Sequence, residues 1–197
     1  AGMVGFYTIV DDVIRSTTTP GPNTTFIPGV TIASVGQAKN LGSLRTRGVE
    51  LTLDRTWKGD LTRVDVWSSL TFINGKLKSP TSRLRYDPPH TSTEMLKLGA
   101  TANYNDRFIF SPSVNFNGPQ SSFIAGTATL GYDQRVPAFY VVNLYAELRS
   151  RNQHLSAFAR ADNLLDARYY NAGFSGVNFF RTPQDSRLVV LGLRVKY

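Results

Sequence analysis

The chain has 197 residues, of which 41% are hydrophobic and only 18% charged, and its formal net charge is +8. The charged fraction lies below the roughly 25% typical of soluble globular proteins, while the apolar and aromatic content argues against disorder. The 22 Lys and Arg residues are spread along the chain without a basic stripe or a recognition-helix pattern, so we expect no nucleic-acid partner.

If this chain crosses a membrane, it must do so as a sheet. No run of 18 apolar residues occurs, which excludes a transmembrane helix. In lipid every backbone N–H and C=O group needs a partner, and a closed antiparallel sheet is the other structure that provides one. The absence of cysteine excludes disulfides and thiolate metal sites.

Hydrophobic residues recur with a period of two along most of the chain, as in strands with one apolar face. Near the C-terminus, for example, Leu191, Leu193 and Val195 alternate with Gly192 and Arg194. In chain order the expected strands are residues 3–13 (the least regular), 49–54, 63–72, 96–104, 108–116, 142–149, 155–162 and 187–197.

The strand lengths and the connections favour a membrane barrel over a soluble sheet. Most runs have about 9–12 residues, which matches a tilted span of the hydrocarbon core rather than a soluble strand of about 5–6. Short turns at 57–60, 105–107 and 151–153 alternate with long polar loops at 15–40, 75–92, 118–137 and 163–186. Outer-membrane barrels have short periplasmic turns and long extracellular loops. This predicts an all-β, antiparallel transmembrane barrel segment of about eight strands in the bacterial outer membrane, with both termini periplasmic.

Aromatic residues fall at both ends of the expected apolar face, as in the interfacial girdles of such barrels. The short-turn end carries Trp57, Tyr104, Phe108 and Tyr197, and the long-loop end carries Phe72, Phe116 and Tyr140.

Six sequence segments carry a family resemblance when they are taken together. Residues 6–14 (FYTIVDDVI) and 40–53 (NLGSLRTRGVELTL) form an upstream strand pair; NLYAEL at 143–148 precedes ADNLLDARYY at 161–170; and PQDSR at 183–187 precedes LGLRVKY at 191–197. In this order they resemble TonB-dependent outer-membrane receptors over essentially the whole chain. The resemblance assigns the family signature to Asn163, Leu164, Asp166 and Tyr169. It assigns the C-terminal signal read by the barrel assembly machinery to Leu193, Val195 and Tyr197.

The resemblance implies that residues 1–197 form the C-terminal portion of a 22-stranded barrel whose plug and earlier strands lie elsewhere. Such receptors take up a scarce nutrient, most often a ferric siderophore, which extracellular loops capture before the TonB complex rearranges the plug. Outer-membrane lipid and lipopolysaccharide (LPS) would surround the barrel. We expect no enzymatic activity, no cofactor and no metal site.

Charged residues on the polar face are expected to line the lumen, because a charge at the lipid midplane costs about 2–4 kcal/mol. They either pair within the wall and with a plug, or make a positive lumen that attracts an anionic ligand. The candidates are Glu50, Arg63, Asp65, Lys97, Glu147, Arg149, Arg160, Asp162, Arg194 and also Lys196.

Exposed aromatic and Arg residues in the long loops are the candidates for ligand contact. LPS phosphates are an equally good target for the Arg residues. The candidates are Arg83, Arg85, Tyr86, Tyr132, Arg135, Phe174, Phe179, Phe180 and Arg181.

Two other folds fit the alternation. A small self-closed eight-stranded barrel with a structural or adhesive role requires residues 3–13 to pair with residues 187–197. A soluble β-sandwich binding module requires Leu144, Leu191 and Val195 to be buried against a second layer.

Overall fold

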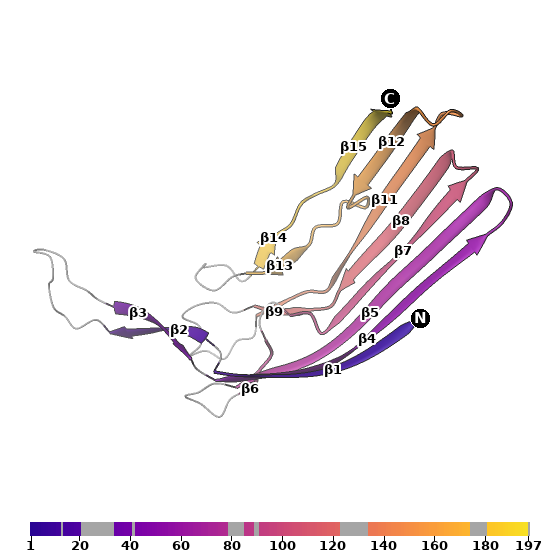
Figure 1. Cartoon of the computed structure of the whole chain (residues 1–197). Helices are drawn as coiled ribbons and strands as arrows, with labels where there is room; N and C mark the ends of the chain where they lie inside the picture. The colour runs from indigo at the N-terminus through magenta and orange to yellow at the C-terminus, as the bar shows by residue number, and fades with distance from the viewer. Residues whose placement is uncertain are drawn as a thin grey trace, which may run out of the picture. The chain divides into compact units, whose positions relative to one another are not determined.

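The structure, a computed structural model, describes residues 1–12, 14–20, 34–40, 42–78, 85–88, 91–122, 134–173 and 181–196. These residues form antiparallel strands joined by turns (Figure 1). No helix among them has the length and hydropathy needed to cross a membrane. The main sheet follows the order β1 (Gly2–Asp11), β4 (Ser43–Lys58), β5 (Thr62–Lys78), β7 (Glu94–Tyr104), β8 (Phe108–Asn117), β11 (Phe139–Arg149), β12 (Leu155–Asp162), β15 (Leu188–Val195).

The eight strands of this path confirm the expected strand number and the antiparallel arrangement. The sheet is open, since β1 stands at one end of the described order and β15 at the other. A self-closed eight-stranded barrel would pair these two strands, so that alternative is not supported. Tight turns join β4 to β5, β7 to β8, and β11 to β12, at the places the sequence predicts.

The long connections contain strands that the sequence analysis assigned to loops. β2 (Ile14–Pro20) pairs with β3 (Ser34–Asn40), and β6 (Arg85–Tyr86) pairs with the end of β5. β9 (Gln120–Ser122) pairs with β10 (Gln134–Val136), and β13 (Tyr170–Ala172) pairs with β14 (Arg181–Pro183). In sequence these segments are short or mostly polar, so alternation of apolar residues does not reveal them; backbone pairing makes them strands.

Strand lengths also differ from the expected 9–12 residues. β4 has 16 residues and β5 has 17, whereas β12 and β15 have 8 each. β4 and β5 continue beyond their apolar stretch because each remains paired with a neighbour, and pairing does not require apolar side chains. β1 ends at Asp11 and β15 at Val195, while Val13 and Tyr197 lie outside the described residues.

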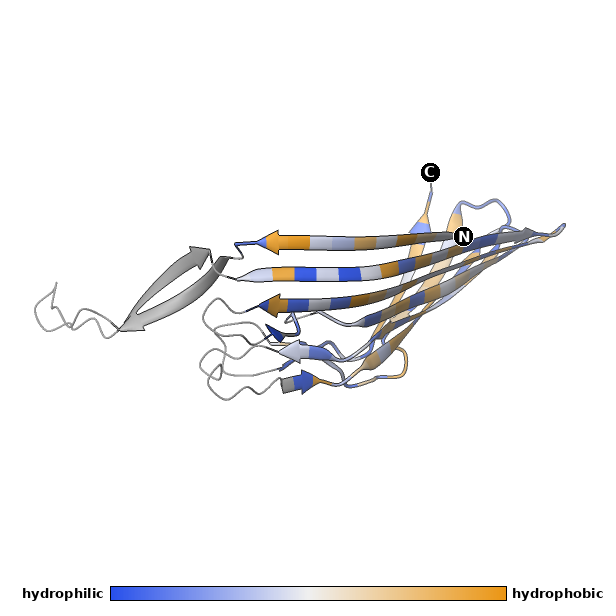
Figure 2. Ribbon diagram, turned by 90° about the horizontal axis from the view of Figure 1, so that it is seen from below, coloured by the Kyte–Doolittle hydropathy of each residue, from blue (hydrophilic) through white to orange (hydrophobic). Residues whose placement is uncertain are grey.

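The chain forms two compact units. The first comprises Ala1–Phe6, Gly48–Asn74 and Pro89–Tyr197, and the second comprises Tyr7–Arg47 and Gly75–Pro88. In the first unit, cross-strand registers such as Leu98↔Val114, Val114↔Val142 and Ala159↔Leu191 place the apolar residues of neighbouring strands on one face. Figure 2 shows the alternation of hydrophobic and hydrophilic residues along the long strands.

The apolar face is exposed rather than covered by a second layer. Leu191 is 76% exposed and Val195 is 58% exposed, and Leu144 is half-buried. The buried hydrophobic residues in the described part of the chain are Leu77, Val136, Val141 and Ala172, none of which belongs to this face of the first unit. A soluble sandwich, which would bury the apolar face, is therefore not supported.

Aromatic rings lie at both ends of the apolar face. Trp57, Tyr104 and Phe108 are exposed near the short turns, and Phe72 and Tyr140 are exposed near the long connections. Tyr104 and Phe108 are directly opposite each other in the β7–β8 ladder. This placement matches the two interfacial girdles of outer-membrane barrels.

Candidate functional site

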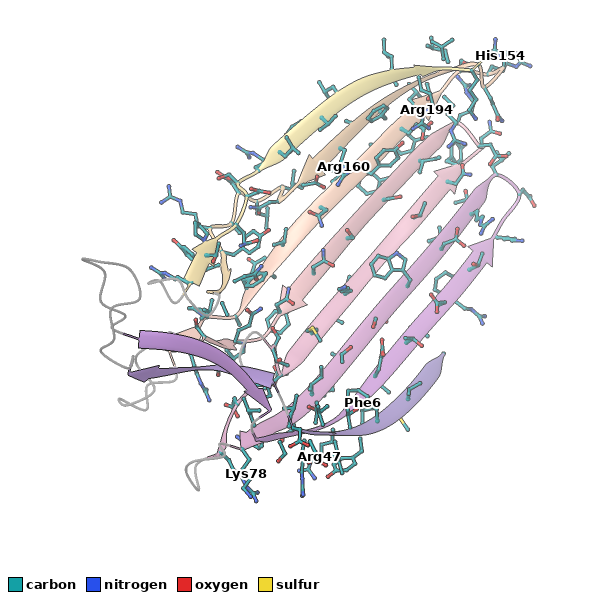
Figure 3. The ribbon with its side chains drawn as sticks, turned by 60° about the vertical axis from the view of Figure 1, so that its left-hand side comes forward. Phe6, Arg47, Lys78, His154, Arg160 and Arg194 are labelled. Carbon is teal, nitrogen blue, oxygen red and sulfur yellow. The ribbon has the colours of Figure 1, made fainter. Side chains whose placement is uncertain are left out.

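The charged residues that the sequence assigns to the lumen lie on one face of the sheet, opposite the apolar face. Register pairs Arg63 with Asn103, Lys97 with Asn115, Tyr145 with Arg160, and Ser156 with Arg194. Two side-chain hydrogen bonds join β4 to this face: Thr56 Oγ1 donates to Asp65 Oδ1 (2.6 Å) and Ser69 Oγ donates to Glu50 Oε1 (3.2 Å). Figure 3 labels two members of the face, Arg160 and Arg194.

Most of these charges pair within a single strand. Arg63 Nε lies 2.8 Å from Asp65 Oδ2, Arg149 Nε lies 3.0 Å from Glu147 Oε1, and Arg160 Nη2 lies 2.9 Å from Asp162 Oδ2. The partners are two residues apart in each case, the spacing that puts both side chains on the same face of a strand. Self-pairing of this kind favours the first interpretation of the sequence, a wall whose charges neutralise one another.

Glu147 is the centre of a small polar and aromatic cluster on β11, β12 and β15. Its residue exposure is 4%, and it accepts hydrogen bonds from Tyr145 Oη (2.7 Å) and Arg149 Nε (3.0 Å). The Tyr145 ring stacks on Phe158 with centroids 6.2 Å apart, and Arg194 Cζ lies 5.8 Å from the centre of the Phe158 ring. Rings that exclude water strengthen the electrostatic interactions beside them, so this cluster holds its charges more rigidly than the exposed pairs do.

Two aromatic rings on the polar face lie over glycines of the neighbouring strand. A Cβ on Gly99 would fall 2.7 Å from Trp67 Cζ2, and a Cβ on Gly192 would fall 2.5 Å from Phe158 Cε1. Gly99 and Gly192 are therefore needed for close approach of the ring to the backbone. The sequence alone gives no role to Trp67, Phe158 or Tyr145, because an aromatic residue opposite a glycine can be recognised only once the register is known.

The long-connection end of the first unit is held together by buried polar groups. Ser92 and Ser121 are 4% and 7% exposed, and Val136 is 1% exposed. Gln120 links three segments, since its Nε2 donates to Ser92 Oγ (3.2 Å) and its Oε1 accepts from Ala172 N (3.0 Å). Ser92 Oγ in turn donates to Gly118 O (3.2 Å). The hydrogen bond from Ala172 N to Gln120 Oε1 thus joins the connections at 118–137 and 163–186.

Four loop candidates for ligand contact lie in the described part of the chain, Tyr86 with its backbone alone. Arg181 on β14 places its Cζ 4.2 Å from the centre of the Tyr170 ring, a cation–π geometry. Arg135 on β10 is exposed, and both Arg residues have further interactions. Arg85 is exposed in β6 of the second unit, where the backbone of Tyr86 is also placed. The other candidates, Arg83, Tyr132, Phe174, Phe179 and Phe180, lie outside the described residues.

Asn163 organises the backbone where β12 ends. It is 3% exposed and has a left-handed φ of 50°. Its Nδ2 donates to Ala167 O (2.9 Å) and to Asp185 O (3.3 Å), and its Oδ1 accepts from Ala167 N (2.9 Å). Asp166, with a φ of 54°, accepts from Arg187 N (2.9 Å), so the two side chains connect the segment after β12 to the segment before β15.

The other signature residues support the same junction. Leu164 N donates to Val142 O of β11 (2.8 Å), and the Tyr169 ring lies 4.6 Å from that of Phe139.

At the end of the sheet, Leu193 and Val195 are 75% and 58% exposed on the apolar face. The described residues contain no group of three or more His, Asp or Glu side chains that could hold a metal ion.

One family model and several solved structures are similar to this chain. A family model described as "TonB dependent receptor-like, beta-barrel" matches residues 1–164. The outer membrane transporter YddB from Escherichia coli is 13% identical, with a TM-score of 0.69 over 99% of this chain and 30% of that chain. The siderophore receptor PiuA from Acinetobacter baumannii is 15% identical, with a TM-score of 0.60 over 99% of this chain and 28% of that chain. The copper transporter OprC is 19% identical, with a TM-score of 0.62 over 99% of this chain and 28% of that chain.

These similarities show the fold of the chain and the share of each solved transporter's length that it spans. This chain spans less than a third of the length of the solved transporters that it matches. A search of curated protein sequences finds no match.

Proposed function

Because the chain belongs to the TonB-dependent receptor β-barrel family, we propose that it forms wall and extracellular loops of a bacterial outer-membrane receptor for a ferric siderophore. The observation that carries this proposal is the division of a single antiparallel sheet into an exposed apolar face and a polar face of paired charges. Such a sheet fits a wall between lipid and a filled lumen.

The proposed orientation follows from the connections. The tight turns after β4, β7 and β11 would lie in the periplasm, and the long connections would lie outside the cell. Both termini would then be periplasmic. The edges of β1 and β15 would pair with the remaining strands of the receptor, since unpaired strand edges are not tolerated in lipid. Leu193, Val195 and Tyr197 would present the closing strand to the barrel assembly machinery.

The polar face would contact a plug rather than select the ligand. Three of its Arg residues are already paired with Asp or Glu on the same strand, which leaves little excess positive potential along the wall. The plug, which would couple uptake to the TonB complex, would complete the contacts of Trp67, Lys97 and Arg194.

Ligand capture is assigned to the joined loops. Arg181 over Tyr170, with Arg135 on the neighbouring hairpin, offers cationic and aromatic groups to a bulky anionic iron chelate. The hydrogen bonds of Gln120 would keep these loops in one arrangement before the ligand arrives, which lowers the entropy cost of binding.

The test is uptake by the complete receptor in a strain that lacks its own siderophore receptors. Cells would be given radioactive iron on a panel of catecholate, hydroxamate and carboxylate siderophores, and radioactive copper in parallel. The double variant Y170A/R181A should lower uptake of the transported chelate about tenfold, while K58Q/R151Q, which removes two cations from the short-turn end, should not. Copper uptake without iron uptake would mean that the ligand is copper and not a ferric siderophore. If neither metal is taken up, the proposal is overturned.

A further inference from the structure

Four cations gather on the polar face where β8, β11, β12 and β15 meet the short turns. Arg107 directly precedes β8, Arg149 ends β11, Arg194 lies near the end of β15, and Lys196 follows that strand. We term these four residues the cationic rim, and all of them belong to the first unit. Figure 3 labels Arg194 on the last strand and His154 in the adjacent turn.

Strand pairing places three of these cations in one row. The backbone hydrogen bond from Arg149 N to Arg107 O (2.7 Å) continues the β8–β11 ladder, so Arg107 stands opposite Arg149. Arg149 is in turn opposite Ser156, and Ser156 is opposite Arg194. Residues directly opposite each other in a ladder share a face. With neighbouring strands about 4.8 Å apart, Arg107 and Arg194 stand about 14 Å apart across three strand spacings.

The carboxylates at these strand ends are already bound. Glu147 is 4% exposed and lies 3.0 Å from Arg149 Nε, and Asp106 accepts from Asn103 Nδ2 (2.8 Å). In the described part of the chain, the other three members of the rim form no ion pair. The Nε of Arg107 donates only to a carbonyl, Arg149 O (3.5 Å). Like charges directly opposite each other in a ladder destabilise it, so the rim calls for an anion from another part of the protein.

An aromatic ring lies beside the cation at the far end of the row. Arg194 Cζ is 5.8 Å from the centre of the Phe158 ring, and that ring lies close against Gly192, where a Cβ would fall 2.5 Å from Phe158 Cε1. The Tyr145 ring is stacked with Phe158 at 6.2 Å. A guanidinium group can donate two parallel hydrogen bonds to one carboxylate. The rings offer an apolar surface to a side chain next to that carboxylate.

The face on which the rim lies excludes membrane lipid as its partner. The apolar residues suited to contact lipid, such as Leu193 and Val195, point to the other side of β15. A partner of the rim must therefore approach from the side of the lumen. The solved transporters extend far beyond the part matched here, since this chain covers 28–30% of them, and the proposed plug is additional chain of this kind.

We propose that the cationic rim docks an extended acidic segment of the plug, so the inference rests on the proposed function, from which the plug is taken. Two Asp or Glu residues four positions apart in an extended segment are about 14 Å apart and point to the same side, which matches the spacing of Arg107 and Arg194. An apolar side chain midway between them would lie against Phe158. The paired charges would fix the register of the segment, and the ring would add apolar contact.

The first measurement is cross-linking of the complete receptor in detergent micelles with a water-soluble carbodiimide. A carboxyl group and an adjacent amine then form an amide, and the carbodiimide takes up the water lost and becomes a urea. The variant R107K/R194K places amines in the row, and mass spectrometry of its peptides should find at least one of them joined to Asp or Glu of the plug. The matched variant R151K, with an amine in a short turn outside the rim, should give at least tenfold less of this product.

Amines at positions 107 and 194 that couple only to carboxylates of the wall, such as Glu147, or to no carboxylate, would overturn the proposal. Coupling to a second copy of the receptor in place of the plug would overturn it as well. No siderophore is present in this measurement. Cross-linking can therefore fail in a receptor that transports a siderophore, or succeed in one that transports another ligand, so the two proposals fail separately.

The second measurement is the ion current through the complete receptor in planar lipid bilayers while urea loosens the plug. At a fixed urea concentration, R107Q/R194Q should raise the fraction of conducting receptors about fivefold, because two exposed charge pairs are lost. The matched variant K58Q/R151Q removes two cations outside the rim and should change this fraction less than twofold. Equal currents from R107Q/R194Q and the unaltered receptor would overturn the proposal. If R107Q/R194Q does not fold, R194Q is compared with R194K, which must conduct like the unaltered receptor.

Discussion

The two faces of the main sheet are built from the same strands, yet they stabilise the protein in opposite ways. On the apolar face, Leu191 and Leu193 are about three-quarters exposed, at 76% and 75%. On the polar face, Glu147 is 4% exposed and is bound by Tyr145 and Arg149. The first face depends on a solvent outside the protein, and the second depends on partners within it.

This difference shows that each face is matched to a different medium. An exposed leucine face is favourable only where the surroundings are as apolar as the side chains, because transfer of that area to water would be unfavourable. Arg–carboxylate pairs belong where water or other polar groups are available.

Val114→Arg should break the apolar face most strongly. Val114 lies in the middle of β8 opposite Leu98 and Val142, where a cation near the lipid midplane costs about 2–4 kcal/mol. Ser113→Arg, one residue away on the polar face and opposite Gly99 and Asn143, should cost much less. The free energy of unfolding of the complete receptor in phospholipid vesicles, measured with urea, tests the pair. Equal costs at the two positions would mean that both faces meet the same solvent.

Asn163→Ala should open the junction between β12 and β15, where the polar face ends. The change removes the partners of Ala167 N, Ala167 O and Asp185 O and forces alanine into a left-handed conformation, at a combined cost of about 2–3 kcal/mol. Asn163→Asp keeps the acceptor oxygen and should cost less. Limited proteolysis should cut residues 163–186 faster in the alanine variant than in the aspartate variant. Identical cleavage of the two variants would mean that the hydrogen bonds donated by Asn163 Nδ2 do not hold this junction together.

Glu147→Gln should weaken the buried cluster by about 1–2 kcal/mol, since Arg149 loses its charged acceptor while the side-chain shape is kept. The double variant E147Q/R149Q should recover part of this loss, because Arg149 then no longer stands as a charge without its carboxylate partner. Urea unfolding of the single and double variants gives the coupling energy between the two residues. An additive result would mean that the charges act independently.

Asp65→Asn should change stability least. The Arg63–Asp65 pair is exposed, with side-chain exposures of 55% and 35%, and exposed pairs are screened by water and salt. Its urea midpoint should differ from that of the unaltered receptor by less than that of Glu147→Gln. A larger shift than at Glu147 would show that burial does not rank the charge pairs of this face.

The fold class, the eight strands of the main sheet and the tight turns could all be predicted from the sequence. Alternation at Leu191, Leu193 and Val195 is a local signal, because neighbouring side chains of a strand point to opposite faces whatever the strand pairs with. The same signal fixed which face is apolar. It also placed Glu147 and Arg149 on the other face, although it could not show that they bind each other.

Register and the pairing of the polar hairpins depend on contacts between distant segments of the chain. Trp67 meets Gly99, and Lys78 meets Arg85, only through the register of neighbouring strands, which the sequence of one strand does not contain. The hairpin of β2 and β3 has no apolar period, so only its backbone ladder makes it a sheet. The face on which a side chain lies follows from the sequence of its own strand. Contacts between distant segments depend instead on how the strands align.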